Sequence, residues 1–408
     1  MENINNNDSN VLNANVTLPI LLIHHIFDTY MGTDYKLLIH KIGSTDKDRS
    51  KLLSIELIMI GGMEDYFRDN LECFRFHWRL CNEACKRGYV NTLAWAREND
   101  FPWTSDTCKE AAKNGHLNCL QWARNNGCPW DSMTCAFAAR SGHLNIVQWA
   151  RQNGCKWDRW TCSYAAEGGH LNILEWARAN GCDWDSTTCS FAAFGGHLNI
   201  LQWARQNGCN WDSTTCSDAA RSGQLICLQW ARENGCPWDK ATCSNAALNG
   251  HLNCLQWARQ NGCEWDINTC RNAADGGHLD IIQWARSNGC RWDAVMCRNA
   301  AAGGHLNVLQ LARQNGCPWN NHICDAAAEK GQLHILQWAR QNGYTIHPSV
   351  GTAAAHGGHL NIVQWLQTNG CRWEVKKCLN IARNNGYTEM ADWIESIIQN
   401  DLIQLAAS

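Results

Sequence analysis

"GHLNILEWARANGCDWDSTTCSFAAFG", residues 169–195, is one copy of a phrase that returns along the chain at a constant interval. The glycine that opens it recurs every 27 residues, from residue 169 to residue 196 for example. The glycines at this position are Gly88, Gly115, Gly142, Gly169, Gly196, Gly223, Gly250, Gly277, Gly304, Gly331 and Gly358. A period between 20 and 50 residues is typical of a solenoid, whose repeats bury their apolar faces only by stacking on neighbours.

The first half of each repeat predicts a short helix with one face of small side chains. In residues 186–196, Cys189, Ala192 and Ala193 have helical spacing, so the helix of the next repeat can come close. Asp185 precedes this segment and is suited to an N-cap. One of the two glycines that end it, Gly195 or Gly196, suits the left-handed residue beyond a helix.

The second half predicts a second helix, residues 197–208, that ends at an Asn-Gly pair. Leu198, Leu201, Ala204 and Arg205 have helical spacing, and Ile200 and Trp203 widen the apolar stripe. We therefore predict an all-α fold, a helix-turn-helix solenoid.

The two segments resemble the helices of an ankyrin repeat. "TTCSFAAFG" resembles the first helix and "GHLNILQWARQNG" the second, in a unit shorter than the usual length of about 33 residues. Short units rich in "WARxNGCxWD" are similar to those of ankyrin-like proteins of large amoeba-infecting DNA viruses. The resemblance implies a scaffold that binds a protein partner on its concave face.

The chain divides into four predicted regions. Residues 1–15 are Asn-rich and should be disordered, residues 16–77 form a helical N-terminal cap, residues 78–386 form the array, and residues 387–408 form a C-terminal capping helix. Three parts of the N-terminal region resemble parts of an F-box: Leu18-Pro19, Ile26-Phe27 and the segment "LECFRFHWRLC". That resemblance implies an alternative function, a substrate adaptor of a ubiquitin ligase.

Composition excludes several function classes. The chain has 408 residues and a net charge of −3, so no overall positive field attracts nucleic acid or acidic lipid. Its longest apolar stretches fall short of the roughly 20 residues that cross a bilayer. No phosphate-binding loop, nucleophile elbow or paired-carboxylate motif stands out. We expect a cytoplasmic, monomeric, non-enzymatic protein that binds neither nucleic acid nor membrane and needs no cofactor.

The 25 cysteines fall mostly into two periodic series, one in the first helix and one in the loop after the second. Equivalent cysteines of neighbouring repeats should lie about 8–10 Å apart, too far for a disulfide, which needs Cα atoms within about 7 Å. We predict reduced, buried, small apolar side chains. An alternative is a metal site with the periodic histidines, but Gln224 and Gln332 replace two of them. Each histidine is predicted instead to cap and tether its helix.

Two further periodic series are predicted to be structural. The tryptophan of the "CxWD" loop should pack between helices as a large apolar ring, with base or carbohydrate stacking as the alternative. The arginine of "WAR" recurs near the end of each second helix, where a cation suits the helix dipole. It is predicted to pair with the aspartate of the following loop rather than to form a polyanion track.

The positions that vary between repeats are the candidate partner-binding residues. All but Trp160, which lies in a nearby variable loop position, are two or five residues after the first-helix cysteine, and the ankyrin resemblance implies that these positions line the concave face. Aromatic residues with arginine at the edge are the usual composition of a binding hot spot. The alternative is that the rings pack on one another as core. The candidates are Phe137, Arg140, Trp160, Tyr164, Phe191, Phe194, Asp218, Arg221, Asn245, Asn272 and Asn299.

Overall fold

The computed structural model describes residues 79–407. The predictions for residues 1–77, the Asn-rich tail and the N-terminal cap, lie outside this range. The F-box-like resemblance does too, except for residues 79–81 at its end. Every regular element between residues 79 and 407 is an α-helix, which confirms the predicted all-α helix-turn-helix solenoid. The described residues belong to two compact units, residues 79–111 with 118–128, and residues 112–117 with 129–407.

The described part of the first unit holds α6 (Arg79–Arg87), α7 (Val90–Glu98) and most of α8 (Ser105–Lys113) and α9 (Leu117–Asn125). Trp103 packs edge-on against Trp122, with 6.2 Å between the ring centroids. The guanidinium carbon of Arg97 lies 4.3 Å from the centre of the Trp103 ring. The same two contacts recur in most repeats of the second unit.

The second unit is a series of helix pairs. Its first helices are α10 (Ser132–Arg140), α12 (Arg159–Gly168), α14 (Ser186–Gly195), α16 (Ser213–Arg221), α18 (Lys240–Leu248), α20 (Ile267–Asp275), α22 (Ala294–Gly303), α24 (Asn321–Glu329), α26 (Ser349–Gly357) and α28 (Val375–Asn384). Its second helices are α11 (Leu144–Gln152), α13 (Leu171–Ala179), α15 (Leu198–Gln206), α17 (Leu225–Glu233), α19 (Leu252–Gln260), α21 (Leu279–Ser287), α23 (Leu306–Gln314), α25 (Leu333–Gln341), α27 (Leu360–Thr368) and the longer α29 (Thr388–Ala407).

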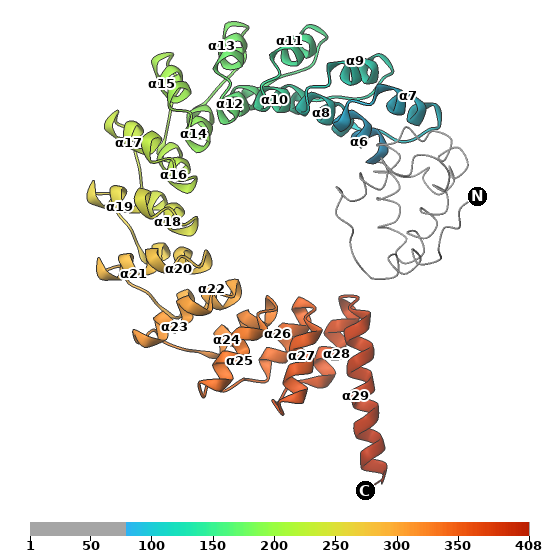
Figure 1. Ribbon diagram of the computed structural model, residues 1–408, viewed down its shortest axis with the longest axis vertical. Helices are drawn as coiled ribbons and strands as arrows, with labels where there is room; N and C mark the ends of the chain where they lie inside the picture. Colours follow the sequence, from blue (N-terminus) through green and yellow to red (C-terminus); the bar gives the residue numbers. More distant parts are fainter. Residues whose placement is uncertain (1–78, 408) are drawn as a thin grey trace, which may run out of the picture. The chain divides into compact units, whose positions relative to one another are not determined.

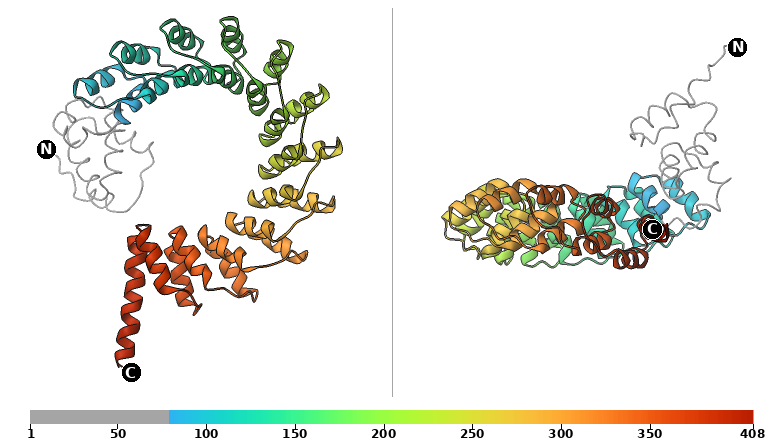
Figure 2. Two further views of the ribbon diagram at one scale, coloured as in Figure 1. Left: turned by 180° about the vertical axis from the view of Figure 1, so that it is seen from behind. Right: turned by 90° about the horizontal axis from the view of Figure 1, so that it is seen from below.

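The second unit is curved because its two rows of helices pack differently. Within it, α10 to α22 follow the inner side of the curve and α11 to α23 the outer side (Figures 1 and 2). Each first helix packs closely on the next, whereas neighbouring second helices barely touch. Cys189, Ala192 and Ala193 are fully buried between the inner helices, and their small size permits this close approach. The outer row therefore spreads while the inner row stays tight.

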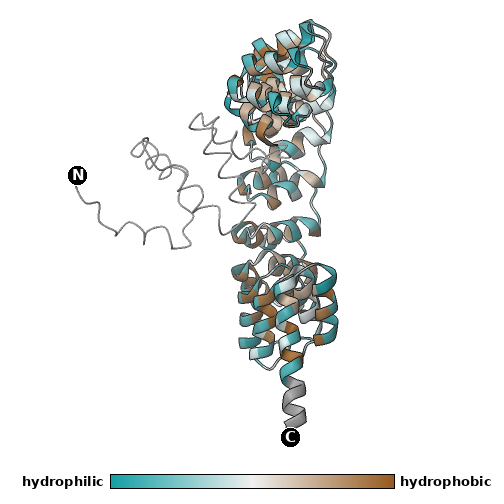
Figure 3. Ribbon diagram, turned by 90° about the vertical axis from the view of Figure 1, so that its right-hand side faces the viewer, coloured by the Kyte–Doolittle hydropathy of each residue, from teal (hydrophilic) through white to brown (hydrophobic). Residues whose placement is uncertain are grey.

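Each helix also separates its apolar from its polar residues. On α15, Ile200, Leu201 and Ala204 are fully buried, whereas Leu198 at the start of the helix is half-buried. The buried stripe thus begins at Ile200 rather than at Leu198, which the spacing had placed in it. Figure 3 shows hydrophobic and hydrophilic residues side by side on the helices of this unit, as expected for elements that bury one face.

The predicted helix ends are confirmed. The Asp185 carboxylate accepts a hydrogen bond from the backbone N–H of Thr187 at 3.0 Å and caps α14. Gly196 follows the helix with φ of 78°, a conformation that L side chains rarely adopt. Gly195 lies inside the helix, where a steric reason requires a glycine. A Cβ added there would lie 2.5 Å from the backbone oxygen of Glu167 in the preceding repeat.

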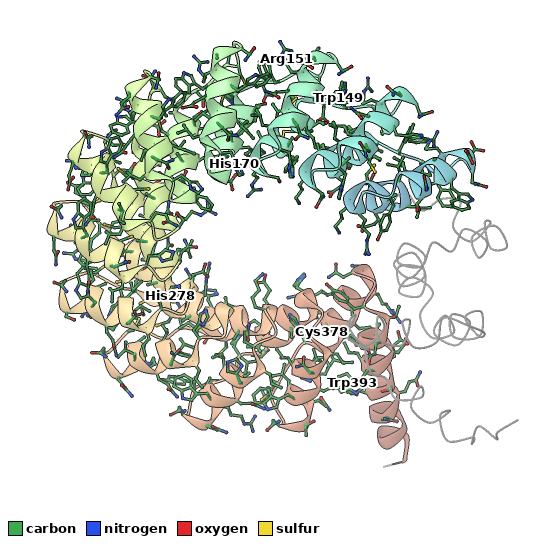
Figure 4. All side chains as sticks on the ribbon, turned by 45° about the horizontal axis from the view of Figure 1, so that its top comes forward. Trp149, Arg151, His170, His278, Cys378 and Trp393 are labelled. Carbon is green, nitrogen blue, oxygen red and sulfur yellow. The ribbon has the colours of Figure 1, made fainter. Side chains whose placement is uncertain are left out.

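The recurring tryptophans and arginines form stacked contacts. Trp130 packs edge-on against Trp149 with 5.8 Å between centroids, which agrees with the predicted packing role. Arg151 places its guanidinium carbon 4.6 Å from the Trp157 ring centre and donates to the backbone oxygen of Cys155 at 3.4 Å. Figure 4 labels Trp149 and Arg151 on α11, toward the outer side of the second unit.

The predicted pairing of these arginines with the loop aspartates is wrong. The aspartates cap the first helices. Two of them form ion pairs with a basic residue at the start of the preceding first helix. Arg159 pairs with Asp185 at 2.8 Å, and Lys240 pairs with Asp266 at 3.0 Å. The guanidinium of the "WAR" arginine is instead held by the loop carbonyl and the indole, four and six residues further along its own chain segment.

The histidines connect repeats, but not by capping their own helices. His170 occupies the N-cap position of α13 without a side-chain capping bond. Its Nε2 is 3.1 Å from the backbone oxygen of Arg140, the last residue of α10. Its ring covers Gly142, where an added Cβ would meet it at 2.6 Å. The prediction of a cap is therefore wrong, and the prediction of a tether is correct. His170 and His278 are labelled in Figure 4.

Loss of one N-cap should destabilise the array measurably. Asp239 accepts a hydrogen bond from the backbone N–H of Ala241 at 2.8 Å, so Asp239→Ala should lower the free energy of unfolding by about 1 kcal/mol. Asn320 stands at the equivalent position and forms no side-chain capping bond. Asn320→Ala is therefore the matched control, and urea unfolding followed by circular dichroism should show little change for it. Equal losses in both variants would contradict the assignment.

Stability should also fall when the pH drops below about 6.5. Burial lowers the pKa of His170 and of His251 below the ordinary value of 6.5, and neighbouring histidines act in the same direction. The unfolded chain then binds more protons than the folded one, so the stabilisation present at pH 7 is lost as the pH falls from 6.5 through the lower folded pKa. Thermal melts between pH 7.5 and 5 test this effect.

The chain provides its own control for the pH effect. Gln332 donates to the backbone oxygen of Ala302 at 3.3 Å and replaces a histidine in the same position. Replacing His170 and His251 with Gln should therefore keep the tether and reduce the loss of stability on acidification. An unchanged pH dependence in this double variant would show that other groups cause it.

Candidate functional site

A pocket of about 300 Å³ opens across four successive first helices of the second unit, α10, α12, α14 and α16. We call it the aromatic pocket. Its lining consists of Arg140, Tyr164, Glu167, Phe191, Phe194, Asp218 and Arg221. These helices lie on the inner side of the curve of this unit (Figure 1).

Helical spacing and close packing together bring these residues to one place. On α12, α14 and α16 the two lining residues are three apart, as Phe191 and Phe194 are on α14, so they share one face. Because neighbouring first helices pack closely, residues one period apart then lie side by side. Tyr164 and Phe191 show this directly, since their rings stack at 5.8 Å with 15° between the planes.

The rings form a continuous cluster. Phe137 lies 5.6 Å from Tyr164, and Trp160 lies 6.0 Å from Tyr164 and 5.9 Å from Phe191, measured between ring centroids. All four rings are half-buried. They therefore pack on one another and still contribute surface. The binding surface and the packed core, which were the two alternatives for these rings, each describe part of this geometry.

Charged side chains surround the rings. Arg140 pairs with Glu167 from the next first helix, and its guanidinium carbon lies 5.6 Å from the Tyr164 ring centre. Arg221 lies 5.9 Å from the Phe194 ring centre. Cations at the faces of aromatic rings are attracted by the ring quadrupole. These contacts hold both long side chains at the edge of the pocket.

Asp218 is the charged group of the pocket that burial affects most clearly. Burial raises the pKa of its carboxyl group, and the Arg221 guanidinium acts in the opposite direction. Within residues 79–400 no cation lies close enough to form an ion pair with this carboxylate. A half-buried carboxylate of this kind favours a partner that supplies a hydrogen-bond donor or a positive charge.

The predicted site residues fall into three groups. Six of them line the pocket: Arg140, Tyr164, Phe191, Phe194, Asp218 and Arg221. Phe137 and Trp160 pack against its rings, and the three asparagines lie on later helices. Sequence reasoning missed Glu167, although it stands at the same variable position as Arg140, Phe194 and Arg221. That shared position was the signal for it.

Two of the predicted asparagines have a structural contact. Asn272 donates from its Nδ2 to the backbone oxygen of Ser244 at 3.3 Å, and Asn299 donates to that of Arg271 at 3.4 Å. Each bond reaches back to the preceding first helix. Asn245 makes no such side-chain bond to the described part of the chain, although all three asparagines occupy the same repeat position.

Searches of the described residues for two other kinds of site gave no candidate. No three His, Cys, Asp or Glu side chains gather there as the ligands of a metal ion would. No helix in the described range combines the length and the hydrophobicity that a bilayer crossing requires.

No protein-family model matches the chain, and no curated protein matches its sequence. Among solved structures, it is similar to the ankyrin repeat domain of human ASB11, at 17% identity over 38% of this chain and 84% of that one, with a TM-score of 0.32. It is also similar to the pentatricopeptide repeat protein PPR10 from maize, at 14% identity over 97% of this chain and 68% of that one, with a TM-score of 0.34.

The asparagine contacts lead to a paired prediction. Asn272→Ala removes the bond to Ser244 and should lower the free energy of unfolding by about 1 kcal/mol. Asn245→Ala removes a side chain without this bond and should have a smaller effect. Urea unfolding of both variants tests the difference. A larger loss in Asn245→Ala would contradict the structural role given to Asn272.

Proposed function

We propose that the chain is a non-enzymatic, ankyrin-like scaffold that binds a protein partner through the aromatic pocket on the inner side of the second unit. The observation that carries this proposal is the position of the variable residues. Most of the chain repeats with little change, and the residues that change most in character between α10 and α16 line one pocket. A repeat scaffold acquires its specificity at such positions.

The composition of the pocket supports a protein side chain as the ligand. Tyrosine, tryptophan and arginine are the residues most enriched at binding hot spots, where aromatic anchors fill pockets with a polar edge. Tyr164, Phe191 and Phe194 supply the apolar area, and the four charged residues surround it. At about 300 Å³ the pocket stands at the lower end of ligand-pocket sizes. One or two side chains of a partner would occupy it.

Phe191→Ala and Phe194→Ala together should weaken capture of the partner by at least about tenfold, because loss of a hot-spot ring costs 2 kcal/mol or more. The partner is first identified by proximity labelling in cells with the intact chain, and its affinity for purified variants is then measured. Circular dichroism of the double variant checks that the array stays folded.

Ile226→Ala provides the matched control. Ile226 is an apolar side chain on α17, a second helix, and 67% of its surface is exposed. Its removal should leave the affinity unchanged. If the control weakens binding as much as the pocket variant does, or if the folded pocket variant binds normally, the partner occupies another surface.

A further inference from the structure

The two cysteine series meet inside eight successive repeats. Cys297 on α22 and Cys317 in the loop after α23 have their Sγ atoms 2.9 Å apart. The thiols of the corresponding pairs are also hydrogen-bonded to each other. The pairs are Cys108–Cys128, Cys135–Cys155, Cys162–Cys182, Cys189–Cys209, Cys216–Cys236, Cys243–Cys263, Cys270–Cys290 and Cys297–Cys317.

This contact differs from the one that the sequence excluded. Equivalent cysteines of neighbouring repeats are separated by a whole helix spacing, but the members of a pair belong to the same helix pair. The loop that leaves the second helix returns to the start of the first, where Cys209 donates its thiol hydrogen to the backbone oxygen of Asp185 at 3.2 Å. Cys189 lies one turn further along α14. The N-cap region therefore holds both thiols in place.

Each pair lies in an apolar environment. Cys135 and Cys155 are fully buried with Ala150, and Trp130, Trp149 and Trp157 pack against them. No disulfide is present among the described cysteines. Two thiols held in contact in this way need only a small movement to reach the geometry of a disulfide.

Two repeats contain only one of the two paired cysteines. Cys324 occupies the first-helix position, but position 344 of the same repeat is a tyrosine, whose ring stacks on Trp319 at 4.2 Å. Cys371 occupies the loop position, but position 351 is a glycine. These two cysteines are therefore natural controls for any chemistry that requires a pair.

Cys189 and Cys209 differ in acidity. The hydrogen bond to Cys209, together with burial, raises the pKa of Cys189. The hydrogen bond from Cys189, assisted by the Arg205 guanidinium, lowers the pKa of Cys209. The thiolate is the nucleophilic form of cysteine, so Cys209 is the member of this pair that attacks an oxidant first.

We propose that these cysteine pairs are oxidation sites, each of which forms a disulfide within its own repeat when the chain meets a peroxide. The loop thiolate attacks one peroxide oxygen, the O–O bond breaks, and a sulfenic acid and hydroxide form. The first-helix thiol then displaces the sulfenic oxygen as water, and the S–S bond forms. In total two thiols and one hydrogen peroxide give one disulfide and two waters.

Buried thiols react only when the repeat opens locally, so the rate follows the opening of each helix pair. Once formed, each disulfide joins the loop after the second helix to the first helix and closes the pair covalently. Because the bonds stay within repeats, the array keeps its curvature and its pocket. Oxidation would therefore strengthen the scaffold without changing its surface.

Peptide mapping tests the proposal on the full-length protein. The reduced protein is incubated with hydrogen peroxide until hydrogen exchange shows that the helices have opened. It is then unfolded in urea with iodoacetamide, so that every remaining thiol is alkylated, and digested without reductant. Trypsin cleaves between the members of each pair, which are separated by Lys or Arg, and a protease that cleaves before aspartate separates successive pairs at the N-cap aspartates up to Cys297–Cys317. Cys317 and Cys324 stay on one peptide, because Asn320 stands at the N-cap between them, and fragmentation of that peptide shows which of the two is alkylated. We expect bridges between cysteines 20 residues apart and alkylated Cys324.

Two variants strengthen the test. Cys317→Ala should leave Cys297 alkylated while the other pairs are bridged. Tyr344→Cys supplies the missing partner and should create a bridge from Cys324 to position 344. The proposal would be overturned if every cysteine were found alkylated, and none bridged, after the helices have opened. Bridges that join neighbouring repeats as often as they join the members of a pair would also overturn it.

Discussion

The close approach of successive first helices is the constraint on which the rest of the structure depends. Fully buried cysteine and alanine side chains leave little space between these helices, so each one rests directly on the next. A larger side chain at Ala192 or Ala193 would have to displace a neighbouring backbone, because close-packed interiors do not accommodate extra volume. The tight inner row, the spread outer row and the alignment of equivalent residues all follow from this contact.

Most polar groups of the repeat are used to keep this stack together. The aspartate caps the first helix, the arginine holds the loop carbonyl, and the histidine reaches the end of the preceding first helix. Each group therefore satisfies backbone atoms that would otherwise be left without partners at the ends of short helices. Most residues that recur between units are occupied in this way, and the pocket is lined by residues that vary.

The aromatic pocket is a consequence of two independent periods. The helical period places Phe191 and Phe194 on one face of α14, and the repeat period places Tyr164 and Asp218 beside them from the neighbouring helices. Stacking between repeats holds the rings without removing them from the surface. The cysteine pairs arise differently, inside one repeat, where the loop after the second helix returns to the N-cap region of the first.

The sequence by itself determined the repeat, the two helices of each unit, their caps and most of the pocket residues, because these depend on local spacing. It could not determine which side chains meet across the stack. The histidine tether, the cation partners of Asp185 and Asp266, and the contact between Cys297 and Cys317 were decided only by the tertiary structure. The physical reason is that each joins groups from different helices, whose relative positions follow from the packing distance and not from any spacing along one segment.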